Sequence, residues 1–179
     1  MKIEETYLKN AFVITPIVYT DDRGYFLESY NKNNLKEVVN IDFMQDNESL
    51  SQKGVLRGMH FQNPPYAQAK LVRVIHGSIL DVILDLRTNS ATYGKHFGLV
   101  LSSENKKQLF IPKGFAHGFL TLEDNTIFSY KCSNYYHKAS EVSLAWNDAS
   151  LAINWGVENP NLSEKDQNAQ NFTNFISPF

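Results

Sequence analysis

The chain has 179 residues, of which 42% are hydrophobic and 13% aromatic, and its 17 basic and 19 acidic side chains give a net charge of −2. This length fits one domain with its own core, and the aromatic content is typical of a β-rich globular protein, which excludes a disordered chain or a coiled coil. No basic run predicts a nucleic-acid partner, and no apolar stretch of about 18 residues predicts a membrane partner. The single cysteine, Cys132, and the absence of an apolar leader favour a cytoplasmic protein without disulfides.

The first half of the chain is predicted to consist mainly of short strands. Segments 11–18 and 24–30 flank a turn of aspartates and glycine, and residues 33–39 have the pattern of a short helix with an asparagine cap. A polar stretch, 44–48, then leads into the apolar segment 54–62. Two β-branched runs, 71–75 and 79–84, meet at His76-Gly77-Ser78, which predicts a β-hairpin.

The second half continues with short strands and ends in a different pattern. Four more strands are predicted at 97–101, 108–111, 118–122 and 126–131, separated by polar turns. Strands at this spacing, without long helical windows, indicate an antiparallel sandwich or jelly roll. Ser163-Glu164-Lys165-Asp166 has the signature of a helix start, and spaced phenylalanines follow it. We therefore expect one domain, residues 1–179, with an ordered C-terminal flap over 157–179.

The segment 54–62 places one imidazole, that of His60, among residues that prefer strands. A lone histidine in such a strand is ordinarily a core residue bonded to a backbone carbonyl, so these residues alone leave a structural and a chemical role open. Strict alternation would put Arg57 and His60 on opposite faces of the strand. If both side chains line one pocket, Gly58 should mark a bulge or bend.

Two segments resemble the two halves of the cupin signature. They are Gly54 with His60 after five intervening residues, and the stretch from Pro112 to His117. A metal-binding cupin has a second histidine two residues after the first, where this chain has Gln62, and no glutamate follows at the expected distance. Two imidazoles are too few ligands for a transition metal, so we expect no metal.

Longer motifs, such as Arg57-Gly58-Met59-His60-Phe61-Gln62, resemble the nucleotide-sugar epimerases of the dTDP-4-dehydrorhamnose 3,5-epimerase family. They follow the family's order along nearly the whole chain, at 22–30, 45–47, 57–62, 68–73, 108–119, 130–136 and 162–166. Ala69 is a departure, because the family commonly has glycine there. The resemblance implies an all-β, cupin-type double-stranded β-helix (jelly roll) with short peripheral helices. It also implies an enzyme that needs neither a metal nor a cofactor, and a homodimer that exchanges N-terminal strands from within residues 1–50.

The implied activity is 3,5-epimerisation of a dTDP-4-keto-6-deoxyhexose, from dTDP-4-dehydro-6-deoxy-D-glucose to dTDP-4-dehydro-L-rhamnose. The C4 ketone acidifies the protons on both neighbouring carbons, so a base, a group that holds the enolate and an acid on the opposite face suffice. By resemblance, His60 is the base and Asp166 is its carboxylate partner. Tyr130 is the acid and Lys70 stabilises the enolate oxygen.

Each of these residues also has an ordinary structural interpretation. Asp166 fits the capping position of the tail helix, Tyr130 fits an aromatic core, and Lys70 fits a solvated strand end. The resemblance assigns substrate binding to Arg57 and His117 near the sugar, and to a nucleotide-binding set consisting of Arg23, Phe26, Glu28, Gln45, Asn47 and Tyr136. Of these, Phe26 and Glu28 are expected from the partner subunit. His76, His96 and His137 are interpreted as turn or surface residues.

Three alternative functions stay open at this point. The first is an epimerase that acts on C3 only or on C5 only. The second is a keto-isomerase, which is disfavoured because its active-site pattern differs from Arg57-x-x-His60. The third is a non-catalytic sugar-binding cupin, which would have no use for a base and an acid on opposite faces.

Overall fold

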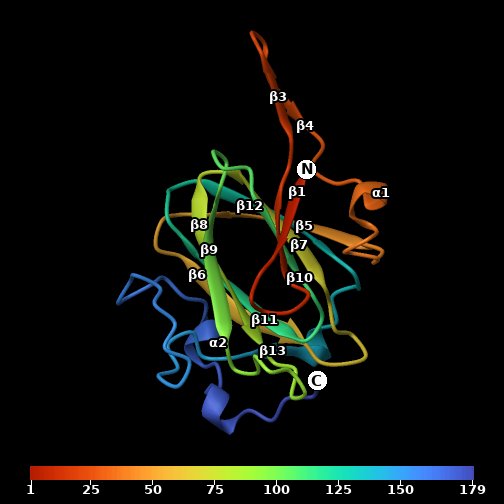
Figure 1. Ribbon diagram of the computed structural model, residues 1–179. Coiled ribbons are helices and arrows are strands. Elements are labelled where there is room, and N and C mark those ends of the chain that lie inside the picture. Colours follow the sequence, from red (N-terminus) through yellow and green to blue (C-terminus); the bar gives the residue numbers. More distant parts are fainter.

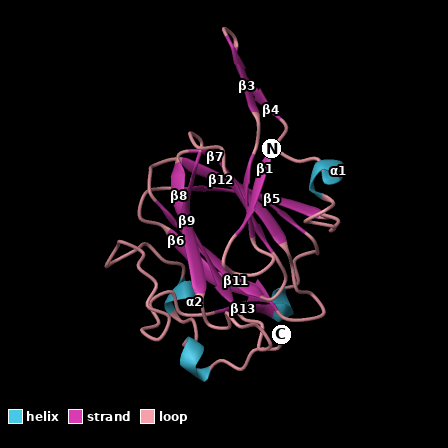
Figure 2. Cartoon of the chain, viewed as in Figure 1, coloured by secondary structure: helices cyan, strands magenta, loops and turns pink.

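The computed structural model describes residues 1–179 and is almost entirely β-structure. Figure 1 shows two facing sheets, a two-stranded hairpin that projects from one end and the last residues of the chain at the other end. The helical segments are short and peripheral (Figure 2). The fold is thus the cupin-like jelly roll that the resemblance implied. No helix is long and apolar enough to cross a membrane.

Six strands form the first sheet, in the order β1 (Lys2–Glu5), β2 (Phe12–Thr15), β10 (Gln108–Ile111), β7 (Lys70–His76), β12 (Thr126–Cys132) and β5 (Gln45–Ser51). Five form the second, in the order β13 (Glu141–Ser143), β6 (Leu56–Gln62), β11 (Phe115–Thr121), β8 (Ser78–Asp85) and β9 (His96–Ser102). The projecting hairpin consists of β3 (Val18–Asp21) and β4 (Gly24–Leu27). The helices are α1 (Lys32–Leu35) and α2 (Glu164–Gln167), with 3₁₀ turns at Lys138–Ser140 and Phe172–Asn174.

The predicted hairpin between 71–75 and 79–84 is wrong. β7 pairs with β10 and β12, whereas β8 pairs with β11 and β9, so the two runs belong to different sheets. The chain changes sheets at Gly77, whose φ is +76° and where a Cβ would clash with Thr126. Because β8 is buried on nearly every residue, its continuous apolar pattern fits an inner strand as well as a hairpin arm.

One polar stretch without a predicted element proved to be a strand, and one predicted helix needed correction. Residues 45–48 of the polar stretch lie in β5, where half-buried side chains alternate with exposed ones because one face lines a cavity and the other meets solvent. The helix predicted at 33–39 is a single turn, and its cap is Asn31, whose side chain accepts the Asn33 N–H. The asparagine-rich helix start explains the error in the helix, because asparagine favours caps over helix interiors.

Three apolar clusters support the sheets. The first fills one part of the space between them and includes Val72 and Val74 of β7 and Ile79 and Ile83 of β8. The second lies behind β6, where Phe175 and Phe179 of the tail pack with their rings 5.4 and 5.9 Å from that of Phe61. The third cluster packs α1 on the outer face of the six-stranded sheet. The remaining space between the sheets stays open as a cavity.

Candidate active site

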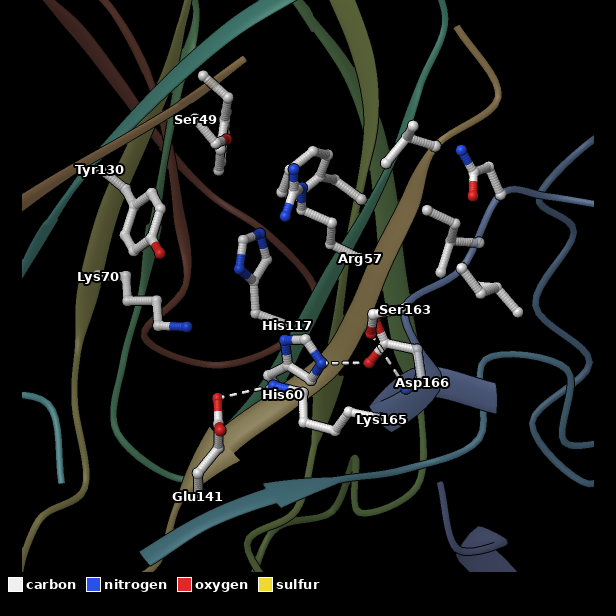
Figure 3. A pocket seen from close by; sticks show the side chains of 16 residues that line it. Ser49, Arg57, His60, Lys70, His117, Tyr130, Glu141, Ser163, Lys165 and Asp166 are labelled. Atoms are coloured by element: carbon white, nitrogen blue, oxygen red, sulfur yellow. Dashed lines mark hydrogen bonds and ion pairs between the residues drawn. The ribbon is translucent and has the colours of Figure 1, made fainter. Parts of the chain in front are cut away.

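The largest cavity lies between the two sheets and has a volume of about 650 Å³. Figure 3 shows its polar lining, in which side chains from both sheets and from α2 point toward one space. A second cavity of about 280 Å³ adjoins the first, since both are lined by His60, Lys70, Tyr130 and Glu141. The two cavities together form one elongated site.

His60 and Asp166 form a close pair at this site. The His60 Nε2 lies 2.5 Å from the Asp166 Oδ1, and the Asp166 side chain is buried. Ser163 caps α2 by accepting the Asp166 N–H, and its hydroxyl donates to the other carboxylate oxygen at 2.9 Å. Burial alone would raise the pKa of Asp166, but the hydrogen bonds and charge of His60 and the bond from Ser163 lower it overall. The Asp166 carboxylate therefore binds both the Ser163 hydroxyl at the helix cap and the His60 imidazole.

A bulge at Gly58 brings Arg57 and His60 to the same cavity, as predicted. His60 pairs with His117 and Arg57 pairs with Phe119, so β6 advances three residues while β11 advances two. Gly58 has a φ of +131°, and a Cβ there would clash with the backbone of Gly118. The extra residue restores both side chains to one face.

Lys70 and Tyr130 line the opposite wall, on β7 and β12 of the six-stranded sheet. The Lys70 ammonium lies 5.6 Å from the centre of the Tyr130 ring. Burial lowers the pKa of Lys70 and raises the pKa of Tyr130, so the phenol keeps its proton at neutral pH. His60 and Tyr130 thus reach the cavity from different sheets (Figure 3).

His117 lies beside His60 and has a carboxylate partner of its own. Its Nε2 is 2.8 Å from the Oδ2 of Asp81, and both residues are buried. Burial lowers the pKa of His117 and outweighs the opposing effect of Asp81, which favours a neutral ring. A neutral imidazole at this position can orient a substrate hydroxyl or carbonyl without adding charge.

The second cavity collects the predicted residues Gln45, Asn47 and Tyr136. Gln45 donates to the Asn47 side chain at 3.0 Å and accepts the Tyr136 N–H at 2.9 Å. The Tyr136 phenol donates to the Glu141 carboxylate at 3.2 Å. This part of the site offers amides and an aromatic ring, which suit a polar ligand with a flat group.

Three predicted residues are not brought to these cavities. Arg23, Phe26 and Glu28 belong to or follow the projecting hairpin, and none of them lines either cavity. Arg23 pairs with Asp21 at 2.6 Å, and Glu28 accepts from Asn31 and Asn34. The Phe26 side chain is 68% exposed. Within one chain, the candidate site therefore contains none of these three predicted substrate-binding residues.

Sequence reasoning missed several residues of the site. Glu141 and Lys165 form an ion pair of 2.9 Å at the cavity, and Ser163 and Asn161 line it. Lys165 and Ser163 lie in a family motif, which was the available signal, whereas Glu141 lies on a strand of only three residues. Asp81, the carboxylate partner of His117, was missed as well, and its only signal was its position as a charged residue inside the apolar run 79–84.

Gln62 occupies the position of the second cupin histidine, and its amide forms hydrogen bonds with backbone groups of two loops. Its amide nitrogen donates to the carbonyls of Tyr66 and Tyr135, and its amide oxygen accepts the His137 N–H. No three His, Cys, Asp or Glu side chains gather into a group that could hold a metal ion.

Comparisons with known proteins agree on one family. Residues 5–174 match the family described as dTDP-4-dehydrorhamnose 3,5-epimerase. The Shigella flexneri protein of that name is 48% identical over 174 residues, which cover 96% of each chain. The Legionella pneumophila epimerase, solved in complex with dTDP-4-keto-L-rhamnose, is 44% identical with a TM-score of 0.94, covering 98% of this chain and 94% of that one. A 3'-monoepimerase from Streptomyces bikiniensis, in complex with dTDP-quinovose, is 30% identical with a TM-score of 0.89, covering 94% and 86%.

Proposed function

This chain belongs to the dTDP-4-dehydrorhamnose 3,5-epimerase family, and we propose that its cavity between the two sheets is where the family reaction takes place. The protein is an isomerase that inverts C3 and C5 of a dTDP-4-keto-6-deoxyhexose, converting dTDP-4-dehydro-6-deoxy-D-glucose to dTDP-4-dehydro-L-rhamnose. The observation that carries the proposed mechanism is the His60–Asp166 pair on one wall of the cavity with Tyr130 on the other.

His60 is the proposed base. Because its Nε2 donates to Asp166, its Nδ1 is the nitrogen that accepts a proton from the substrate carbon. The imidazolium that forms is stabilised by the buried carboxylate. Negative charge meanwhile develops on the ketone oxygen, and the Lys70 ammonium is the proposed partner for it, with Arg57 close to the same cavity.

Tyr130 is the proposed acid. Its phenol, protonated at neutral pH, delivers a proton to the opposite face of the enolate, so the configuration at that carbon inverts. The imidazolium then releases its proton and the phenolate regains one, which resets the site for the second carbon. His60 and Tyr130 lie on opposite sheets, which supports their assignment as base and acid on opposite faces of the substrate.

We further propose a homodimer in which the β3–β4 hairpin of each chain completes the other's site. The hairpin projects from the body of the chain (Figure 1), and it exposes Tyr19, Tyr25 and Phe26. Exposed aromatic residues on an isolated hairpin favour contact with another protein surface. Arg23, Phe26 and Glu28 would then reach the partner's second cavity, where a guanidinium suits the diphosphate. The buried, unpaired Cys132 supports a cytoplasmic location.

A single-carbon epimerase is the second candidate, because the Streptomyces 3'-monoepimerase has the same fold over most of this chain. Incubation with dTDP-4-dehydro-6-deoxy-D-glucose in heavy water, followed by magnetic resonance, separates the two candidates. We expect deuterium at both C3 and C5. Deuterium at one carbon only would identify a single-carbon epimerase, and no exchange at either carbon would contradict catalysis.

A further inference from the structure

The loop at Tyr135–His137 has no regular hydrogen-bonded structure, yet its backbone is held at three consecutive residues by two glutamine side chains. The amide nitrogen of Gln62 donates to the Tyr135 carbonyl at 3.2 Å, and its oxygen accepts the His137 N–H at 2.7 Å. The Gln45 oxygen accepts the Tyr136 N–H at 2.9 Å. These side chains replace the strand partners that the loop lacks.

Gln62 also ties this loop to a second one. The same amide nitrogen donates to the Tyr66 carbonyl at 2.7 Å, and the Tyr66 ring stacks on the His137 imidazole with 3.7 Å between ring centres. Gln62 is 5% exposed, and its three bonds use both of its amide atoms. The side chain, which also lines the second cavity, is therefore a buried clamp whose amide is already bound to both loops.

Tyr136 is the residue that this clamp holds in place. It lies between the two residues bound by Gln62, its side chain is 54% exposed, and it lines the second cavity with Gln45 and Asn47. A loop that already has its binding conformation loses little freedom when a ligand arrives, whereas a mobile loop reduces affinity by the fraction of time spent elsewhere.

We propose that Gln62 is a positioning residue for nucleotide binding, which presets Tyr136 at the second cavity without taking part in proton transfer. This inference rests on the proposed function, since it takes the occupant of the second cavity to be the nucleotide part of the substrate. It predicts a selective effect on affinity. The chemistry at His60 and Tyr130, in the adjoining cavity, should be preserved.

The test is Gln62→Met, which keeps the length of the side chain and removes all three hydrogen bonds. If the binding conformation of the loop falls to roughly a tenth of the population, the affinity for dTDP alone, measured by calorimetry, should fall about 10-fold. KM for the sugar nucleotide should rise by a similar factor while kcat changes little. In a Tyr136→Ala background the same change should have almost no further effect, because the two residues act as one unit.

A matched control is Thr126→Val, which removes another hydrogen bond from a buried side chain to a loop, the one from the Thr126 hydroxyl to the Glu123 carbonyl at 2.8 Å. It should lower the melting temperature but leave the affinity for dTDP unchanged. Equal loss of affinity in both variants would reduce Gln62 to a general stabilising role. Unchanged affinity in Gln62→Met, a loss of kcat alone, or full additivity with Tyr136→Ala would each overturn the inference.

Two further measurements test the inference if the Gln62→Met variant does not fold. Gln62→Glu keeps an acceptor for the His137 N–H but turns a carboxylate toward two carbonyls, so it should weaken dTDP binding as well. Hydrogen exchange on the parent protein without nucleotide should show a protected His137 amide. Fast exchange at His137 would contradict a preset loop. A parent protein that does not bind dTDP at all would instead refute the proposed function.

Discussion

Replacement of Tyr130 by phenylalanine separates the two halves of the proposed mechanism. The change deletes only the phenol oxygen, and the ring keeps its contact with Phe128, whose centre lies 5.5 Å away. Abstraction by His60 and stabilisation of the enolate by Lys70 stay intact. The enolate would then regain its proton from the imidazolium, on the face from which the proton left.

The structure sets the size of the expected effect. Tyr130 lines the cavity and its ring stays packed on Phe128 when the oxygen is removed, so stability should change by about 0.5 kcal/mol or less. A positioned general acid typically contributes about 10²–10⁴-fold, so the barrier to inversion should rise by about 2.7–5.4 kcal/mol. Exchange of the substrate proton with solvent should fall far less.

The assay is magnetic resonance of the sugar ring protons in heavy water, which reports exchange and configuration in one experiment. Tyr130→Phe should incorporate deuterium much faster than it forms inverted product, whereas His60→Ala should lose both reactions. If Tyr130→Phe abolishes exchange as completely as His60→Ala, or inverts the substrate at the parental rate, Tyr130 is not the opposing acid.

Four further expectations follow from the site and the fold. Asp166→Asn should lower kcat strongly with little change in melting temperature, because an amide can accept the imidazole N–H but cannot stabilise its charge; near-parental turnover would leave Asp166 with its capping role alone. Exhaustive chelation should not affect turnover, and a loss of activity restored by one divalent ion would contradict metal-free catalysis. Mixing His60→Ala with Arg23→Ala should regain about a quarter of parental activity if hairpins are exchanged in dimers, and no recovery would argue against exchange. Burial raises the pKa of Asp85, but hydrogen bonds from Arg87, Ser90 and Thr92 lower that pKa overall. The ionised carboxylate therefore stabilises the fold fully above its unfolded-state pKa of about 3.9, and this stabilisation is lost as pH falls through the folded-state pKa. In urea unfolding, the stability difference between the parent and Asp85→Asn should shrink from pH 5 toward pH 2.5, and a difference independent of pH would refute this assignment.

Local patterns predicted individual strands well and their partners poorly. The strands expected at 108–111 and 126–131 match β10 and β12 to within one residue, because polar turns delimit them. The runs 71–75 and 79–84 are also strands, but nothing in their alternation reveals that they join different sheets. Sheet membership depends on contacts between distant segments.

The candidate site likewise contains some residues that local sequence patterns indicate and others that depend on contacts between distant segments. His60 stands out because it interrupts an apolar strand, and Gly58 signalled the bulge that turns Arg57 toward it. Asp166, in contrast, is 106 residues away from His60, so only the family motif could connect the two. Asp81 was missed because one carboxylate within β8 does not disturb the strand pattern, although burial beside His117 makes it part of the site.

The contact between Gly58 and Gly118 limits how the cavity can be redesigned. A Cβ on Gly118 would lie 2.8 Å from the Met59 sulfur and 3.0 Å from the Arg57 carbonyl oxygen, so the backbones of β6 and β11 meet with no side chain between them. Substitution of Gly58, which has a φ of +131° and would place a Cβ 2.4 Å from the Gly118 Cα, is therefore strongly disfavoured at this point of the wall that carries His60 and His117. Libraries aimed at a different sugar should vary the loop around Tyr136 and the segment at Asn161 and leave the two glycines unchanged.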